Sequence, residues 1–126
     1  MGLDQAVTFA PGKVPAYSAV SELLAQRGFP LQMRMIDGNL AFPDEMPPET
    51  WRELRLATPQ GMVTVRRENE RIVCVTWGNA DAVLLQAWNA VTWAFAVLGD
   101  GRIAGPVGTM SAAEFQKTAD FPPALR

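Results

Sequence analysis

The sequence predicts an α+β fold: a single antiparallel sheet of about five strands, with two main helices packed on one face and a short C-terminal helix. Two observations predict the larger elements. Between residues 31 and 77, short segments alternate apolar and polar residues and are separated by turn sequences, which is typical of antiparallel strands. On either side, residues 15–27 repeat apolar side chains at helical spacing, and residues 80–98 form a long apolar segment.

A length of 126 residues suits one domain. Residues 1–13 show neither pattern, so we interpret them as an N-terminal lead-in, and residues 14–126 as a single α+β domain. Asp4, Pro11 and Lys13 interrupt any early apolar run, so no secretory signal is predicted and we expect a cytoplasmic protein.

The composition excludes several classes of function. A hydrophobic content of 48% with 19% charged residues is typical of a globular domain. The net charge of −2 argues against nucleic-acid binding. Histidine is absent and Cys74 is the single cysteine, which removes the commonest general base and leaves no ligand set for zinc. We expect no metal and no cofactor, and the lack of a catalytic motif favours a protein that is not an enzyme.

The first helix begins near Pro15, because a missing N–H is tolerated at a helix start, and ends at Gly28, a typical C-cap. Asp37-Gly38 predicts a tight turn between strands at 31–36 and 40–42, since both residue types tolerate positive φ. Three more strands are predicted at residues 53–58, 62–67 and 71–77.

Alternation along the strands assigns side chains to two faces of the sheet. Predicted on the face covered by the helices are Met33, Met35, Leu54, Leu56, Val63, Val65, Val73, Val75 and Trp77. Predicted on the opposite, open face are Gln32, Arg34, Glu53, Arg55, Thr64, Arg66, Cys74 and Thr76.

The apolar segment ADAVLLQAWNAVTWAFAVL (80–98) predicts a long helix, with Asn79 as a cap and Asp81 placed favourably for the helix dipole. Its apolar part, 82–98, would extend about 26 Å, short of the roughly 30 Å of a membrane core, so we expect no membrane span.

The apolar arc of this helix is wider than the roughly 100° stripe needed to cover a sheet. The surplus includes Trp88, Trp93 and Phe95, which must contact the first helix, the C-terminal segment or a second subunit. Aromatic residues are enriched in interface cores, so we expect a homodimer with these three at the interface. Burial within one chain alone is the alternative.

Two further motifs lie near the C-terminus. GDGRIAGPVG (99–108) contains glycines at the spacing of a dinucleotide fingerprint, but it follows a helix instead of a strand, so we interpret it as a helix end with a Gly-rich turn. Ser111 and Glu114 have the spacing of a capping box and predict the start of a short helix.

Arg34, Arg55 and Arg66 are the candidate ligand-binding residues, because guanidinium groups on an open sheet face can bind a carboxylate or phosphate with two hydrogen bonds. A solvated face with Arg–Glu pairs is the alternative. An apolar ligand pocket is weighed against packing of the same residues in the core; its lining would be Trp51, Trp77, Trp88 and Trp93 with Met33 and Met35.

The order of elements is similar to that of small secretion-chaperone-like binding modules, but no motif is shared and no family is assigned. The sequence therefore favours a non-enzymatic protein-interaction module that acts as a homodimer. The alternative is a binder of a small anionic ligand, or a His-free enzyme, that uses the sheet-face arginines beside a Trp-lined pocket. A structural subunit of a larger assembly is a third hypothesis.

Overall fold

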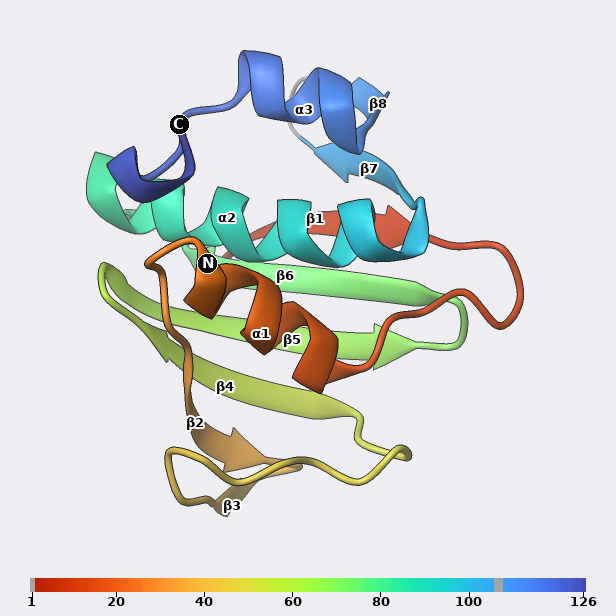
Figure 1. Cartoon of the computed structure of the whole chain (residues 1–126), viewed down its shortest axis with the longest axis vertical. Coiled ribbons are helices and arrows are strands. Elements are labelled where there is room, and N and C mark those ends of the chain that lie inside the picture. Colours follow the sequence, from red (N-terminus) through yellow and green to blue (C-terminus); the bar gives the residue numbers. More distant parts are fainter. Residues whose placement is uncertain (1, 106–107) are drawn as a thin grey trace.

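The computed structural model describes residues 2–105 and 108–126. Over this part of the chain the fold is α+β, with three α-helices and one antiparallel sheet of eight strands (Figure 1). The helices are α1 (Tyr17–Gln26), α2 (Ala82–Gly99) and α3 (Ala112–Thr118), and a 3₁₀ turn, η1 (Pro123–Leu125), follows them. The strands are β1 (Gly2–Thr8), β2 (Gln32–Ile36), β3 (Asn39–Leu40), β4 (Glu53–Thr58), β5 (Gly61–Glu68), β6 (Arg71–Trp77), β7 (Arg102–Gly105) and β8 (Gly108–Ser111).

The α+β class and the antiparallel sheet are confirmed, but the prediction of about five strands is wrong. The strand order is β3-β2-β4-β5-β6-β1-β7-β8, so the five predicted strands occupy one side of the sheet. The added strands are β1, β7 and β8. Hairpin turns connect β2 to β3, β4 to β5 and β5 to β6, and such local turns are readable from sequence.

The supposed lead-in contains a strand that lies inside the sheet. Residues 2–8 form β1, which pairs with β6 along its whole length and with β7 through Ala6, Val7 and Thr8. Both partners are distant in the sequence, so no neighbouring turn marks this strand. The segment 99–108, expected to be a turn, contains β7 and the first residue of β8, and its residues 106–107 lie outside the described part.

The predicted faces are wrong for β6. A two-residue turn, Asn69-Glu70, joins β5 to β6, so odd-numbered residues of β5 face even-numbered residues of β6, and Val65 pairs with Cys74. Val65 and Cys74 are both fully buried on the covered face. Val73, Val75 and Trp77 therefore lie on the open face, the reverse of the prediction, because the register of a hairpin is set by the length of its turn.

The predicted faces are also wrong for part of β2, because this strand contains a β-bulge. Met33 pairs with Leu56 on the covered face as predicted, but the register shifts between Met33 and Met35. Met35 consequently pairs with Arg55 on the open face, and Arg34 occupies the bulge. A bulge inserts one residue and so reverses the alternation beyond it.

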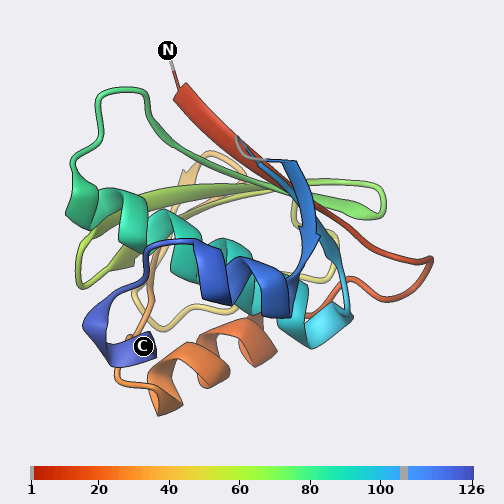
Figure 2. The ribbon, with the colours of Figure 1, turned by 90° about the horizontal axis from the view of Figure 1, so that it is seen from above.

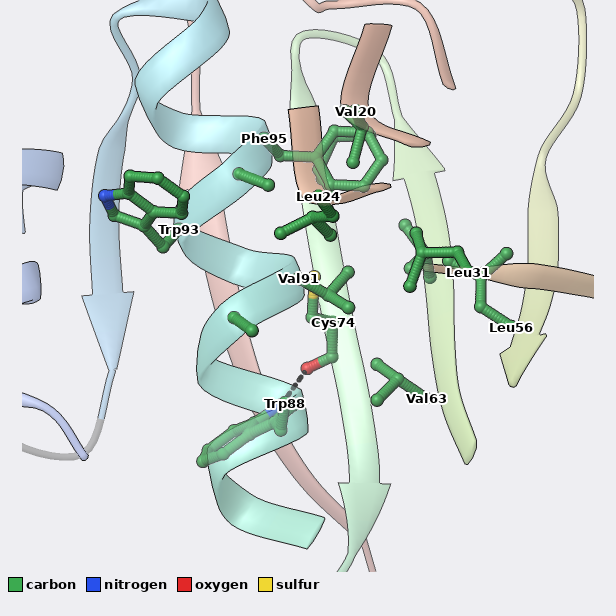
Figure 3. Close-up of a cluster of buried hydrophobic side chains, with 14 of the residues drawn as sticks. Val20, Leu24, Leu31, Leu56, Val63, Cys74, Trp88, Val91, Trp93 and Phe95 are labelled. Carbon is green, nitrogen blue, oxygen red and sulfur yellow. Dashed lines mark hydrogen bonds between the residues drawn. The ribbon is translucent and has the colours of Figure 1, made fainter. Parts of the chain in front are cut away.

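The helices lie on the same side of the sheet in Figure 2, and α2 contacts β5, β6 and β1. In Figure 3, Phe95 of α2 lies beside Val20 and Leu24 of α1, within the buried core. On the sheet side, the Trp88 Nε1–H donates to the carbonyl oxygen of Cys74 at 2.7 Å. Each large apolar side chain buried in this way contributes about 1.5–3 kcal/mol to stability.

The polar residues of α2 have partners on both sides. Gln5 of β1 is buried and donates through Nε2 to Asn89 Oδ1 at 3.2 Å and to Thr92 Oγ1 at 3.1 Å. Asn89 Nδ2 donates to the carbonyl oxygen of Asp120 at 2.8 Å, and Gln86 Nε2 donates to its carboxylate at 2.9 Å. The helix is thus held between β1 and the C-terminal segment.

Two of the three helices, α2 and α3, begin with a side-chain cap, whereas α1 has none. Asp81, two residues later than the predicted cap Asn79, accepts a hydrogen bond from the amide of Leu84 at 2.9 Å. The capping box of α3 is confirmed, since the Ser111 and Glu114 side chains each accept a hydrogen bond from the other's amide.

Within the described residues, α2 is long and apolar enough to cross a membrane by length and composition alone. Core helices of soluble proteins meet the same criteria, and 56% of this helix is buried inside the chain.

Candidate functional site

The candidate site lies on the open face of the sheet, where no helix of the described chain covers the strands (Figure 2). Strand pairing arranges its side chains in rows across the sheet. One row contains Arg55 of β4, Thr64 of β5, Val75 of β6 and Asp4 of β1. A neighbouring row contains Glu53, Arg66, Val73 and Ala6. Because side chains alternate along each strand, members of both rows project from the same face.

A depression of about 420 Å³ opens on this face across β4, β5 and β6. The residues that line it include Gly2, Glu53, Arg55, Met62, Thr64, Arg66, Val75 and Trp77. We call it the open-face depression. It combines charged, hydroxyl and apolar side chains, the mixture typical of a site that binds and orients a small molecule.

The apolar part of the depression is unusually exposed. The Trp77 side chain is 67% exposed and Met62 is 42% exposed. Trp77 ends β6 and pairs with Gly2, which has no side chain to cover the indole ring. Exposed aromatic surface beside polar groups is a common feature of binding sites.

The charged part of the depression contains one ion pair, between Arg66 and Glu53, and a further arginine, Arg55, that is not part of this pair. Arg66 Nε lies 3.3 Å from Glu53 Oε2, and the two residues are paired across β4 and β5. Arg55 forms no ion pair within residues 2–105 and 108–126. Its guanidinium therefore retains its donors for a ligand.

A turn fixes the start of β4 and with it Glu53. Asp37 accepts hydrogen bonds from the amides of Arg52 at 2.7 Å and Glu53 at 2.9 Å, and its own amide donates to the Glu53 carbonyl at 2.8 Å. The bonds from the Glu53 and Arg52 amides favour the ionised carboxylate and hold the pKa of Asp37 below its ordinary value. The predicted Asp37-Gly38 turn thus positions one wall of the depression.

Two of the three predicted arginines, Arg55 and Arg66, come together in the open-face depression. Arg34 does not line it, because the β2 bulge places this residue outside the paired rows. Met62 was not among the predicted site residues, and Trp77 was predicted only as one of four tryptophans of an apolar pocket, on the covered face of the sheet. The two-residue turn after β5 is the signal that places Trp77 on the open face.

The three predicted interface residues lie in the interior of the single chain. Trp88 and Trp93 are each 4% exposed and Phe95 is fully buried. Trp93 packs edge-on against Phe121 with ring centroids 6.2 Å apart, so the C-terminal segment covers it. Of the predicted tryptophan set, Trp51 is also buried, beneath the guanidinium of Arg67 at 4.9 Å.

Cys74 offers no nucleophile to the site. It is fully buried, and burial raises the pKa of its thiol to about 12, so the thiol stays protonated at neutral pH. In the described part of the chain, no group of three metal-ligating side chains comes together.

Comparison of the chain with protein-family models, with curated proteins and with solved structures gives no match.

Proposed function

We propose that the protein is a non-enzymatic binding protein, and that its open-face depression binds a small ligand with an anionic group and a flat apolar part. The observation that supports this proposal is that Arg55, Arg66 and the exposed ring of Trp77 line the same depression. Arginines gathered in a depression favour the binding of an anionic ligand over the alternative that they are only solvated surface residues.

The chemistry of the lining supports binding. Arginine offers donors in a planar fork that fits a carboxylate or phosphate, while Trp77 and Met62 offer surface to a ring. A volume of about 420 Å³ lies within the range of small-molecule sites. The carboxylate of the depression, Glu53, is engaged by Arg66, which favours a binding role over acid–base catalysis.

Titration with the fluorescent anion 8-anilinonaphthalene-1-sulfonate tests the proposal. We expect saturable binding that Arg55→Gln and Trp77→Ala each weaken by about ten-fold, because the first removes the contact with the anionic group and the second removes the contact with the ring. Arg34→Gln is the matched control: it removes an exposed arginine of the same sheet outside the depression, and the affinity should stay within about two-fold. Circular dichroism checks that all variants are folded. Equal affinities in the four proteins would contradict the proposal.

A second candidate is the protein-interaction module acting as a homodimer. We propose that its contact lies on the segment 40–46, which runs from β3 into the loop before β4; there Leu40 is 89%, Phe42 75% and Met46 56% exposed. Three large apolar side chains exposed within seven residues are typical of an interaction surface, and a second copy of the chain is the partner we propose for it.

Native mass spectrometry at several concentrations tests this candidate and also reports any co-purified small molecule. We expect a dimer that Phe42→Ser converts to monomer while leaving the circular dichroism spectrum unchanged. A monomer at every concentration would contradict the homodimer.

A further inference from the structure

We infer that the ligand of the open-face depression is a small aromatic monocarboxylate and that Arg55 is the residue that binds its carboxylate. This inference rests on the proposed function and names the ligand class. It follows from the charge of the depression and from the spacing between Arg55 and Trp77.

The charge of the depression favours a monoanion. Glu53 neutralises Arg66 at 3.3 Å, while Arg55 has no ionic partner in the described chain, so the three side chains together carry a single positive charge. A monocarboxylate neutralises that charge. A phosphate monoester near its dianionic form leaves a surplus negative charge beside Glu53, and like charges at short range repel.

The partners of Arg55 suit a carboxylate. Thr64 is half-buried directly opposite Arg55 on the neighbouring strand, and its hydroxyl can donate to an oxygen that the guanidinium also binds. An arginine fork and one hydroxyl match the two in-plane oxygens of a carboxylate.

The position of Trp77 places a ring close to that carboxylate. Val75 shares the row of Arg55 and Thr64 but lies two strands from Arg55, about 10 Å across the sheet, and Trp77 lies about 7 Å further along β6, so the Cα atoms of Arg55 and Trp77 are about 12 Å apart. A guanidinium–carboxylate contact at one end and ring stacking at the other take up most of this separation, which leaves room for an acid whose ring is joined to the carboxylate directly or through one or two atoms, with the ring over Trp77 and Met62.

Calorimetric titration at pH 7.5 with three ligands that share one ring system tests the inference: 2-naphthoate, 2-naphthyl phosphate and neutral 2-naphthalenemethanol. We expect naphthoate to bind most tightly, by about ten-fold over each of the others. Arg55→Gln should remove this advantage and leave the affinity for the neutral alcohol unchanged. Arg55→Lys, which keeps the charge without the planar fork, should lose part of it, and Arg34→Gln should lose none.

Glu53→Gln tests the charge argument by a different route. It releases Arg66 and leaves two positive charges, so naphthyl phosphate should gain about ten-fold relative to naphthoate. An unchanged ratio of the two affinities would overturn the role assigned to the ion pair.

The outcomes separate this inference from the function on which it rests. Tighter binding of naphthyl phosphate than of naphthoate by the wild type would overturn the monocarboxylate and leave an anion-binding depression in place. Binding of none of the three at millimolar concentration would overturn both. Tighter binding of acetyl-Gly-Trp with a free carboxylate than of naphthoate would assign the depression to peptide C-termini and overturn the small-molecule ligand.

Discussion

The two faces of β6 differ in a way that its composition does not suggest. The face against α2 carries Ile72, Cys74 and Thr76, whereas the open face carries Val73, Val75 and Trp77, the more apolar set. An open sheet face is normally the polar one. Here the polar residues of the open face are concentrated on β4 and β5, and the apolar ones on β6, and the open-face depression lies where the two meet.

This difference shows how sheet register can place apolar surface outside the core. The turn of Asn69-Glu70 fixes which residues of β6 face Val65, and Cys74 is buried as a consequence. Trp77 is then exposed although its hydrophobicity favours the interior. A large apolar residue kept at the surface by register contributes little to stability and remains available for contact with a ligand.

The sharpest test of the two faces compares two tryptophans. Trp88→Ala should lower the free energy of unfolding by about 3–5 kcal/mol, since it opens a cavity and removes the hydrogen bond to Cys74. Trp77→Ala should lower it by less than about 1 kcal/mol, because the ring is 67% exposed. Urea unfolding followed by circular dichroism measures both. Equal losses would mean that β6 presents the other face to the helix.

The second prediction concerns Gln5, which joins β1 to α2. Gln5→Ala should cost about 2 kcal/mol in urea unfolding, because Thr92 loses a buried hydrogen bond and Asn89 a partly buried one. The matched control is Asp4→Ala on the exposed side of the same strand, with a change below about 0.5 kcal/mol. If both variants were as stable as the wild type, β1 would not be part of the folded sheet.

A third, smaller effect depends on pH. The pKa of Asp37 is lowered in the folded protein, so its ionised form stabilises the fold above the unfolded pKa near 3.8, and this contribution disappears as the pH falls through the folded value. Asp37→Asn should cost about 1 kcal/mol at pH 7 through its weaker hydrogen bonds to the amides of Arg52 and Glu53.

The difference between wild type and Asp37→Asn should stay constant from pH 7 to pH 5 and shrink below about pH 4. Unfolding curves at four pH values measure it. A difference that grew on acidification would contradict the assigned sign.

The smallest predicted effect separates two adjacent arginines. Arg67 lies over the ring of Trp51 at 4.9 Å and donates to the carbonyl oxygen of Glu49, so Arg67→Gln should cost about 1 kcal/mol. Arg66→Gln removes an exposed ion pair with Glu53 and should cost less than about 0.5 kcal/mol. The reverse order in thermal or urea unfolding would contradict the assignment of Arg66 to the open face.

The elements readable from the sequence are those defined by local signals. The turn at Asp37-Gly38 and the capping box of Ser111 are confirmed, because each depends on residues close together in the chain. The first helix, predicted over about 15–27, spans Tyr17–Gln26, with Arg27 as its C-cap and Gly28 following at positive φ. β1 could not be predicted in this way. Its partners lie far along the sequence, and its buried Gln5 has the character of an exposed residue until Asn89 and Thr92 are placed beside it.

The candidate site could be predicted in part. Arg55 and Arg66 follow from simple alternation, and their shared depression is the geometry that alternation implies. Predicting the face on which Trp77 lies depends on the length of the turn between β5 and β6, and the sequence supplies that turn as Asn69-Glu70. The displacement of Arg34 depends on a bulge at Met33–Met35, and no residue type in that segment marks one.

The position of β1 has a consequence for how the chain folds during synthesis. β1 pairs on one edge with β6, from Gly2 opposite Trp77 to Thr8 opposite Arg71, and on its other edge with β7, which follows α2. The strands from β2 to β6 can form successive hairpins as they leave the ribosome, whereas β1 is made before both of its partners and must wait until β6 has been synthesised before it can pair. We therefore expect β1 to join late and the free edge of β6 to be the vulnerable surface of the nascent protein.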